Sequence, residues 1–220
     1  MPSTTIIGRK YKLFSIACSL AFATTFGSTN CQEPETAFSA YKSGNYLRAI
    51  ELYSAQIKVN QEYAPIFYGR GLAYSKLDSN EAAISDLSTA IKLDTKNADA
   101  YYSRGLAYSK LANYQSALAD FNKATEINSK KADYHYAKAN IYYYLENDDL
   151  SIDSYTQALS IDPGYALAYY GRAVAYRYKK DNAKAKADFT QYLAMNINNN
   201  SIFTDEAKRM IEAIDKEAAE

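Results

Sequence analysis

Apolar and polar positions along this chain repeat on two scales. On the short scale, small and apolar residues recur every three or four positions, which predicts amphipathic α-helices. On the long scale the whole pattern returns every 34 residues, and five such intervals follow one another without an insertion. These intervals, units one to five, are 30–63, 64–97, 98–131, 132–165 and 166–199. A fixed period of this length predicts an array of stacked units.

Each unit is predicted to form two helices joined by a tight turn. In unit three, Tyr101, Gly105 and Tyr108 mark one helical face, and Ala117 and Phe121 begin a second face after a polar break. Small residues at unit positions 8, 20 and 27 let two helix backbones approach closely. Aromatic residues at positions 11 and 24 are expected to fill the space between successive helix pairs.

This pattern resembles the tetratricopeptide repeat, and the resemblance covers about 170 residues as five units of ~34 residues. It implies an all-α fold, a right-handed superhelix that is an α-solenoid of helix-turn-helix repeats. There are two departures from the family pattern. The aromatic residue usual at position 4 is Glu33 in unit one. The proline usual after the second helix survives only as Pro163, and Gln61, Thr95, Ser129 and Ile197 replace it elsewhere.

An arginine at position 7 and an aspartate at position 23 occur together. Arg70, Arg104 and Arg172 coincide with Asp86, Asp120 and Asp188, whereas unit four has Lys138 and Ser154 and unit one has Thr36 and Leu52. We expect each arginine to bond the aspartate on the second helix of its own unit, with a structural role.

The N-terminal segment 1–29 has a different composition and is predicted to be a signal peptide. Arg9, Lys10 and Lys12 precede an apolar run from Leu13 to Phe26 that ends at small residues. Cleavage is expected near 23 or near 27. An uncleaved membrane anchor is the alternative, but about 14 moderately apolar residues fall short of the ~20 that span a bilayer. The sequence therefore predicts export, to a periplasmic or secreted location.

Cysteine usage leaves one alternative open. Cys18 would leave with the signal, so the mature chain would carry Cys31 alone and no internal disulfide. Lipidation at Cys31, giving a lipid-anchored envelope form, is the second interpretation, because the position is suitable. The residues Ser28, Thr29 and Asn30 before it fit a lipoprotein signal poorly.

Charge and composition argue against several classes of function. The chain has 25 basic and 25 acidic residues, so no basic excess indicates nucleic-acid binding. His135 is the single histidine and is expected to be a packing residue. Gly69, Arg70 and Gly71 lie within a predicted helix and do not form a phosphate-binding loop. We expect no enzymatic activity, no metal and no cofactor.

The first helices are expected to line the concave side of the superhelix and to bind a partner there. Position 5 is tyrosine in four consecutive units, beside a small residue at position 6 that would leave room for a ligand backbone. An alternative is that these rings only cover neighbouring helices. The clamp by which some family members hold chaperone tails is absent. The predicted partner-binding residues are Tyr68, Leu72, Lys76, Tyr102, Leu106, Lys110, Tyr136, Asn140, Tyr144, Tyr170, Val174, Arg177 and Tyr178.

The C-terminal segment 200–220 is predicted to be a capping helix, with an apolar stripe at Ala207, Met210, Ile211, Ile214 and Ala218. The alternative is a free helix for a partner. Together these features predict a scaffold or adaptor that binds another protein or peptide, in the bacterial cell envelope. An accessory or regulatory subunit of an envelope enzyme or assembly machine is the second interpretation. The sequence leaves the partner and the oligomeric state open, and it predicts no membrane contact beyond the signal or a lipid anchor.

Overall fold

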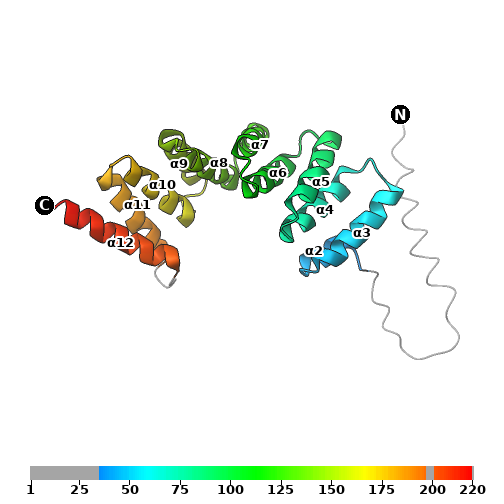
Figure 1. The fold of residues 1–220 in the computed structure, drawn as a ribbon, viewed down its shortest axis with the longest axis horizontal. Coiled ribbons are helices and arrows are strands. Elements are labelled where there is room, and N and C mark those ends of the chain that lie inside the picture. Colours follow the sequence, from blue (N-terminus) through cyan, green and yellow to red (C-terminus); the bar gives the residue numbers. More distant parts are fainter. Residues whose placement is uncertain (1–34, 197–200, 220) are drawn as a thin grey trace, which may run out of the picture. The chain divides into compact units, whose positions relative to one another are not determined.

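A computed structural model describes residues 35–196 and 201–219, and within these ranges the regular structure is entirely helical (Figure 1). The prediction of an all-α solenoid is confirmed. The helices are α2 (Ala37–Lys42), α3 (Tyr46–Val59), α4 (Ala64–Lys76), α5 (Asn80–Leu93), α6 (Ala98–Lys110), α7 (Tyr114–Ile127), α8 (Ala132–Tyr144), α9 (Asp148–Ile161), α10 (Ala166–Tyr178), α11 (Asn182–Met195) and α12 (Ile202–Glu217).

The helices form a row of hairpins in chain order. Within each unit the first helix packs on the second, and each second helix also packs on the first helix of the next unit. Successive first helices contact one another more closely than successive second helices do. The first helices α4, α6, α8 and α10 therefore lie on the concave side of this row (Figure 1).

The turn between the two helices has the same backbone in every unit. The residue at position 15 is left-handed, with φ from 54° to 60° at Asp78, Ala112, Glu146 and Lys180. Only unit one places a glycine there, Gly44. Non-glycine residues pay about 1 kcal/mol for this conformation. An N-cap side chain at position 16 offsets it in units one, three, four and five by accepting a bond from the third residue of the second helix.

A side-chain hydrogen bond holds the connection that follows each of units one to four, with or without a proline there. The residue that follows each of the helices α3, α5, α7 and α9 accepts a bond from the backbone N–H two residues further on, at 2.9 to 3.1 Å. These residues are Asn60, Asp94, Asn128 and Asp162. Asn and Asp side chains mimic a backbone turn in this way. Units one to three, which lack the family's proline, therefore keep a defined connection to the next unit.

The core of each hairpin is a contact between small residues and one large side chain. Position 20 is fully buried in all five units, as Ala49, Ala83, Ala117, Ser151 and Ala185. The aromatic or leucine residue at position 24 is also buried, from 8% exposed at Tyr53 to 0% at Phe189. Burying such a side chain contributes about 1.5 to 3 kcal/mol. The predicted packing at positions 20 and 24 is thus confirmed, and the tyrosines at position 11 of units two to five are half-buried.

The predicted arginine–aspartate pairs are present in all three units. In unit three, Arg104 Nε and Nη2 donate to Asp120 Oδ2 and Oδ1 at 2.8 and 2.7 Å. Arg70 and Arg172 bond Asp86 and Asp188 in the same bidentate way. The third nitrogen of each arginine bonds a hydroxyl of the preceding unit, Ser54, Ser88 or Thr156, at 2.9 to 3.0 Å. Each arginine therefore joins two units as well as two helices, and we call the arginine with its aspartate and hydroxyl partners an arginine clamp.

The last helix packs on α11, burying Ala207 and Ile214 and half-burying Met210 and Ile211. The apolar stripe predicted here was one residue too long. Ala218 follows the end of α12 and is exposed. His135 is buried as expected, with its Nε2 3.1 Å from the carbonyl oxygen of Ser129.

Some predictions concern residues outside the described ranges. The signal peptide 1–29, its cleavage sites, Cys31 and Glu33 all belong to this group. Among the helices of residues 35–196 and 201–219, none has the length and the apolar character needed to cross a membrane.

Candidate functional site

The four tyrosines at position 5 lie on the four first helices of units two to five, and all four are half-buried. Tyr102 contacts Phe121 and Tyr134, with ring centroids 5.8 and 5.0 Å apart. Tyr170 contacts Phe189, and also Phe203 of α12. Tyr136 and Tyr68 likewise pack against neighbouring helices. Part of each ring supports the fold and part faces solvent.

Burial further disfavours the ionised form of these tyrosine hydroxyls, which are neutral at physiological pH in any case. It raises the pKa of Tyr102 to about 12, with the carboxylate of Asp133 adding to the effect. It also raises the pKa of Tyr68, Tyr136 and Tyr170 above the ordinary value. At physiological pH each ring therefore offers a neutral hydroxyl that can donate or accept a hydrogen bond.

The remaining predicted residues differ in how far their side chains are exposed to solvent. Leu72, Asn140 and Val174 are half-buried, and Leu106 is 39% exposed. Lys76 and Lys110 are exposed at the ends of α4 and α6, and Tyr144 and Tyr178 are exposed at the ends of α8 and α10.

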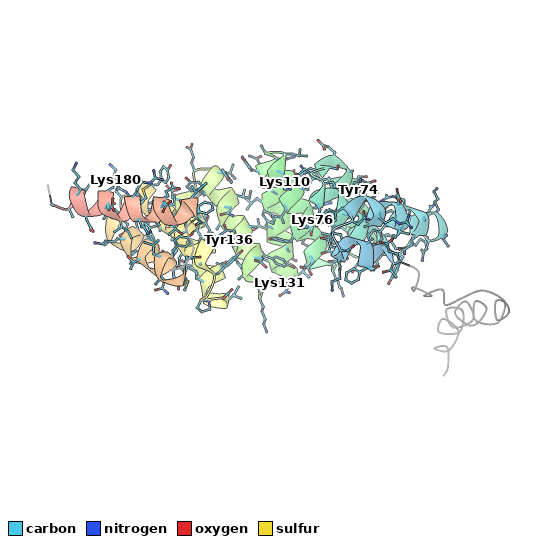
Figure 2. All side chains as sticks on the ribbon, turned by 90° about the horizontal axis from the view of Figure 1, so that it is seen from below. Tyr74, Lys76, Lys110, Lys131, Tyr136 and Lys180 are labelled. Carbon is cyan, nitrogen blue, oxygen red and sulfur yellow. The ribbon has the colours of Figure 1, made fainter. Side chains whose placement is uncertain are left out.

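Two of the cations in this set already have partners. Lys110 pairs with Asp78 at 2.5 Å, and Arg177 bonds Asn182 at 2.8 Å and pairs with Glu217 of α12. Within the described residues Lys76 has no ion-pair partner. Figure 2 shows Lys76 and Lys110 near each other, with Tyr136 further toward the C-terminal end.

An aromatic pocket of about 340 Å³ lies between α8, α9, α10 and α12. It brings together five predicted residues, Tyr136, Asn140, Tyr144, Tyr170 and Val174. Tyr143 at position 12, Leu167 at position 2 and Gly171 at position 6 also line this pocket and belong to the predicted face, whereas Tyr155, Phe203 and Glu206 were not predicted. Phe203 and Glu206 come from α12, so the last helix contributes directly to the pocket. Asn140 accepts a bond from Tyr155 Oη at 2.5 Å, which fixes the amide.

A polar pocket of about 380 Å³ lies between α2, α4, the start of α5, and α6. It brings together Leu72, Lys76, Tyr102, Leu106 and Lys110 from the predicted set. Tyr41 and Ser75 at position 12 and Ser103 at position 6 also belong to the predicted face, whereas Asn80 and Ala107 were not predicted. Asn80 begins a second helix, α5, whereas the predicted binding residues all belong to the first helices.

Two polar atoms of this pocket are buried without a hydrogen bond. Asn80 is 8% exposed, and neither its Oδ1 nor Ser75 Oγ has a partner among the described residues. An unsatisfied buried polar group costs about 1 to 3 kcal/mol. The aromatic pocket has no such atom among the residues that line it. The polar pocket is therefore the place where a ligand could satisfy hydrogen bonds that the fold leaves open.

Three predicted residues, Tyr68, Arg177 and Tyr178, line neither pocket. The reason given for the small residues at position 6 also needs correction at two sites. A Cβ at Gly69 would lie 2.4 Å from Cζ of Tyr53, and a Cβ at Gly171 would lie 2.4 Å from Cζ of Tyr155. In these units glycine makes room for the tyrosine of the preceding unit, and not for a ligand backbone.

The described residues contain no group of three or more His, Cys, Asp or Glu side chains arranged to hold a metal ion. What the concave side offers is hydrogen bonding, two lysines and aromatic surface. These are the components of a binding surface.

Comparison with known proteins gives a consistent result. Family models described as tetratricopeptide repeat match residues 98–131, 132–165 and 166–199, and one described as TPR repeat matches 77–111. No curated protein matches this sequence.

Several solved structures share the fold. A crystal structure of MamA is 26% identical, with a TM-score of 0.70, and covers 74% of this chain and 96% of its own. YrrB, described as a TPR protein with an unusual peptide-binding site, is 21% identical, with a TM-score of 0.68, and covers 79% and 88%. MamA from Desulfovibrio magneticus RS-1 is 18% identical, with a TM-score of 0.70, and covers 75% and 93%.

The matched intervals follow one another in tandem and together span 77–199, more than half of the 220 residues. The helices of those intervals have the hairpin packing described above. On this combined basis the chain belongs to the tetratricopeptide repeat family.

Proposed function

We propose that this protein is a non-enzymatic scaffold that binds a polypeptide segment along the concave side of its first helices. The observation that carries the proposal is the pair of pockets on that side, each lined by residues from two successive first helices at equivalent positions. Tyr102 and Leu106 in one pocket correspond to Tyr136 and Asn140, and to Tyr170 and Val174, in the other. A ligand that follows the array would meet the same kind of contact more than once.

The description of YrrB supports this proposal, because that protein shares the fold and has a peptide-binding site. The tyrosines add to it. A tyrosine that is half-buried is held in place by its neighbours, so little conformational entropy is lost when a ligand contacts its free edge. Each tyrosine hydroxyl is neutral at physiological pH and can hydrogen-bond a main chain.

The test is capture of a partner by the full chain, followed by variants of the tyrosine row, which is the set of position-5 tyrosines Tyr68, Tyr102, Tyr136 and Tyr170. Truncating Tyr102 and Tyr136 to alanine is expected to weaken binding by about 2 kcal/mol or more. The matched control is Tyr63→Ala, because Tyr63 is 53% exposed and lines neither pocket. Circular dichroism accompanies each measurement. Normal binding by the double variant, or unfolding before binding can be measured, would assign the row to the core.

We further propose that the protein is exported and acts in the cell envelope, on the basis of the charged and apolar pattern of residues 1–29. Mass spectrometry of the exported protein is expected to find an N-terminus at Thr24 or Ser28. An acylated Cys31 would instead establish the lipid-anchored form.

The alternative role, an accessory subunit of an envelope enzyme or assembly machine, differs in the partner that is captured. If the partner is an enzyme whose turnover changes when this protein is added, the accessory role is correct. Turnover by the isolated chain in a broad hydrolase screen would contradict both readings.

We propose that α12 closes the array, because it covers the apolar face of α11 and contributes Phe203 to the aromatic pocket. Deleting Thr204 to Glu220 is expected to lower the melting temperature or cause association, since it exposes that face. A monomer with unchanged melting would show that the helix is not a cap.

A further inference from the structure

The two pockets on the concave side differ in charge and in hydrogen-bonding capacity. The polar pocket has two lysines, Lys76 and Lys110, and two buried polar atoms without partners, Ser75 Oγ and Asn80 Oδ1. The aromatic pocket has no lysine or arginine among its lining residues, and its one charged group is Glu206. The two ends of the binding surface should therefore select different residues of a ligand.

We propose that the polar pocket binds an acidic residue within an extended partner segment, with Lys76 pairing with its carboxylate and Asn80 accepting a main-chain N–H. The proposal rests on the proposed function, since it names the chemistry of the polypeptide that the scaffold would bind. It assigns roles to Asn80, Ser75 and Lys76 that do not depend on the tyrosine row.

The requirement for a donor comes from Asn80. Asn80 lines the pocket, and its Oδ1 is a buried acceptor that has no hydrogen-bond partner among the described residues. Only an N–H or O–H group can satisfy it. Every residue of a polypeptide except proline carries a main-chain N–H, so an extended segment supplies a donor whatever its sequence. Ser75 Oγ can then donate to or accept from a neighbouring group of the same segment.

The preference for a negative charge comes from the lysines. Lys76 has no ion-pair partner among the described residues, so its ammonium is free to meet a ligand. Lys110 pairs with Asp78, but both side chains are at least half exposed, at 50% and 77%. A pair so exposed to solvent is weak and can exchange. Asp78 is the acidic group nearest to this cation, and it does not line the pocket.

The position of the pocket indicates an internal residue of the segment and not its C-terminus. Tyr41 of α2 bounds one end of the pocket, and at the other end the first helices continue from α6 to α8 and α10. A chain that occupies the polar pocket can therefore continue along this row, and the clamp that holds a free C-terminus in some family members is absent here. Leu72 and Leu106 make part of the pocket lining apolar. This lining suits an apolar residue next to the acidic residue of the partner segment.

The test is selection from a phage-displayed library of random peptides fused to the coat protein at their C-termini, so that no free carboxyl terminus is offered. Peptides selected on the full chain are expected to be enriched in Asp and Glu, and their binding is expected to weaken as salt is raised. The Lys76→Glu variant is expected to bind these peptides about tenfold more weakly and to select basic residues instead. Lys92→Glu, an exposed site on α5 with the same change of charge, is the matched control.

A second variant tests the buried acceptor by a different measurement. Asn80→Leu keeps the branched shape and the number of heavy atoms of the side chain, and it removes an acceptor that has no partner among the described residues. The melting temperature is expected to stay the same or rise, while the selected peptides bind about tenfold more weakly. A purely structural role for Asn80 would give the opposite result, a lower melting temperature with unchanged binding in the molecules that remain folded.

The outcomes separate this inference from the proposed function. Peptides enriched without acidic residues, or bound equally by Lys76→Glu, would overturn the inference and leave the scaffold intact. If synthetic peptides bind only when their C-terminus is free, the pocket recognises a terminal carboxylate, and the proposal of an internal acidic residue is wrong. Failure of the library and of cell extracts to yield any ligand would overturn both proposals.

Discussion

Units three and four have the same backbone but hold their two helices together by different chemistry. In unit three, Arg104 and Asp120 form a bidentate pair with side chains 19% and 6% exposed. In unit four the same positions are Lys138 and Ser154, and Lys138 has no ion-pair partner among the described residues. The helices nevertheless pack in the same way in both units.

In unit four, neutral hydrogen bonds link the two helices in place of the arginine–aspartate pair. Ser151, at a position that is alanine in the other units, donates its Oγ proton to the carbonyl oxygen of Ala139 at 3.0 Å. Tyr155 Oη donates to Asn140 Oδ1 at 2.5 Å, where unit three has a phenylalanine. The comparison teaches that the small residues set the helix spacing, while the polar contact that locks it can vary.

The largest expected effect is in unit three. Replacing Asp120 by alanine leaves Arg104 with its charge unpaired in a mostly buried position, and we expect a loss of about 3 kcal/mol in the free energy of unfolding. Urea unfolding followed by circular dichroism measures it. The matched change in unit four, Ser154→Ala, is expected to cost less than about 1 kcal/mol.

A paired variant sharpens the result. Changing Arg104 to methionine together with Asp120 to leucine removes both charges, and it is expected to cost less than Asp120→Ala alone. Equal losses in the single and the paired variant would mean that the lost packing, and not the unpaired charge, dominates.

The fold could be predicted from the sequence because small and aromatic residues recur in register. The arginine–aspartate pairs were predictable for a related reason, since positions 7 and 23 change together. The connection between units was not predicted. An Asn or Asp, such as Asn128, follows each second helix in the sequence, but the family pattern directs attention to the proline position one residue later.

The candidate site was predicted in part. Residues on the first helices, such as Tyr102 and Val174, line the two pockets as expected. Asn80 and Phe203 could not be found in that way, because they come from the start of a second helix and from α12. Whether a helix turns such a residue toward a neighbouring unit depends on packing between units, which the pattern within one unit does not contain.

The next effect concerns Tyr155, the tyrosine at position 24 of unit four. Tyr155 occupies the space beside Gly171 of unit five, so a methyl group at Gly171 would displace the ring. We expect Gly171→Ala to cost about 1 to 2 kcal/mol, the overpacking penalty reduced by the better helix propensity of alanine. Ser103→Ala is the matched control, because it is the same position following the leucine of unit two, Leu87. A stabilised Gly171→Ala protein would show that the ring moves freely.

A smaller effect is expected at the hydroxyl of the same ring. Tyr155→Phe converts this position to the residue found in unit three and removes the donor to Asn140, at an expected cost of about 1 kcal/mol. The control is Tyr108→Phe, since the hydroxyl of Tyr108 makes no hydrogen bond within the described residues. A cost at Tyr108 equal to that at Tyr155 would contradict the role assigned to the Asn140 bond.

The smallest effect, and one of opposite sign, is expected at Lys138. Burial lowers the pKa of this ammonium below its ordinary value. The unfolded chain therefore binds more protons than the folded chain in the pH range between the two pKa values, and stability rises with pH across that range. Lys138→Met removes the half-buried charge without leaving an unpaired partner, because position 23 here is a serine.

We expect Lys138→Met to be neutral or to stabilise by about 0.5 kcal/mol at neutral pH. The gain should shrink at alkaline pH, where Lys138 of the natural chain is neutral in both states. Arg104→Met in unit three is the matched control, and it should destabilise because Asp120 stays buried and unpaired. Urea unfolding at neutral and alkaline pH measures all of these. If both substitutions destabilise equally, Lys138 has a stabilising contact equivalent to the pair of Arg104 and Asp120. Units three and four would then differ in residue type but not in the strength of this contact.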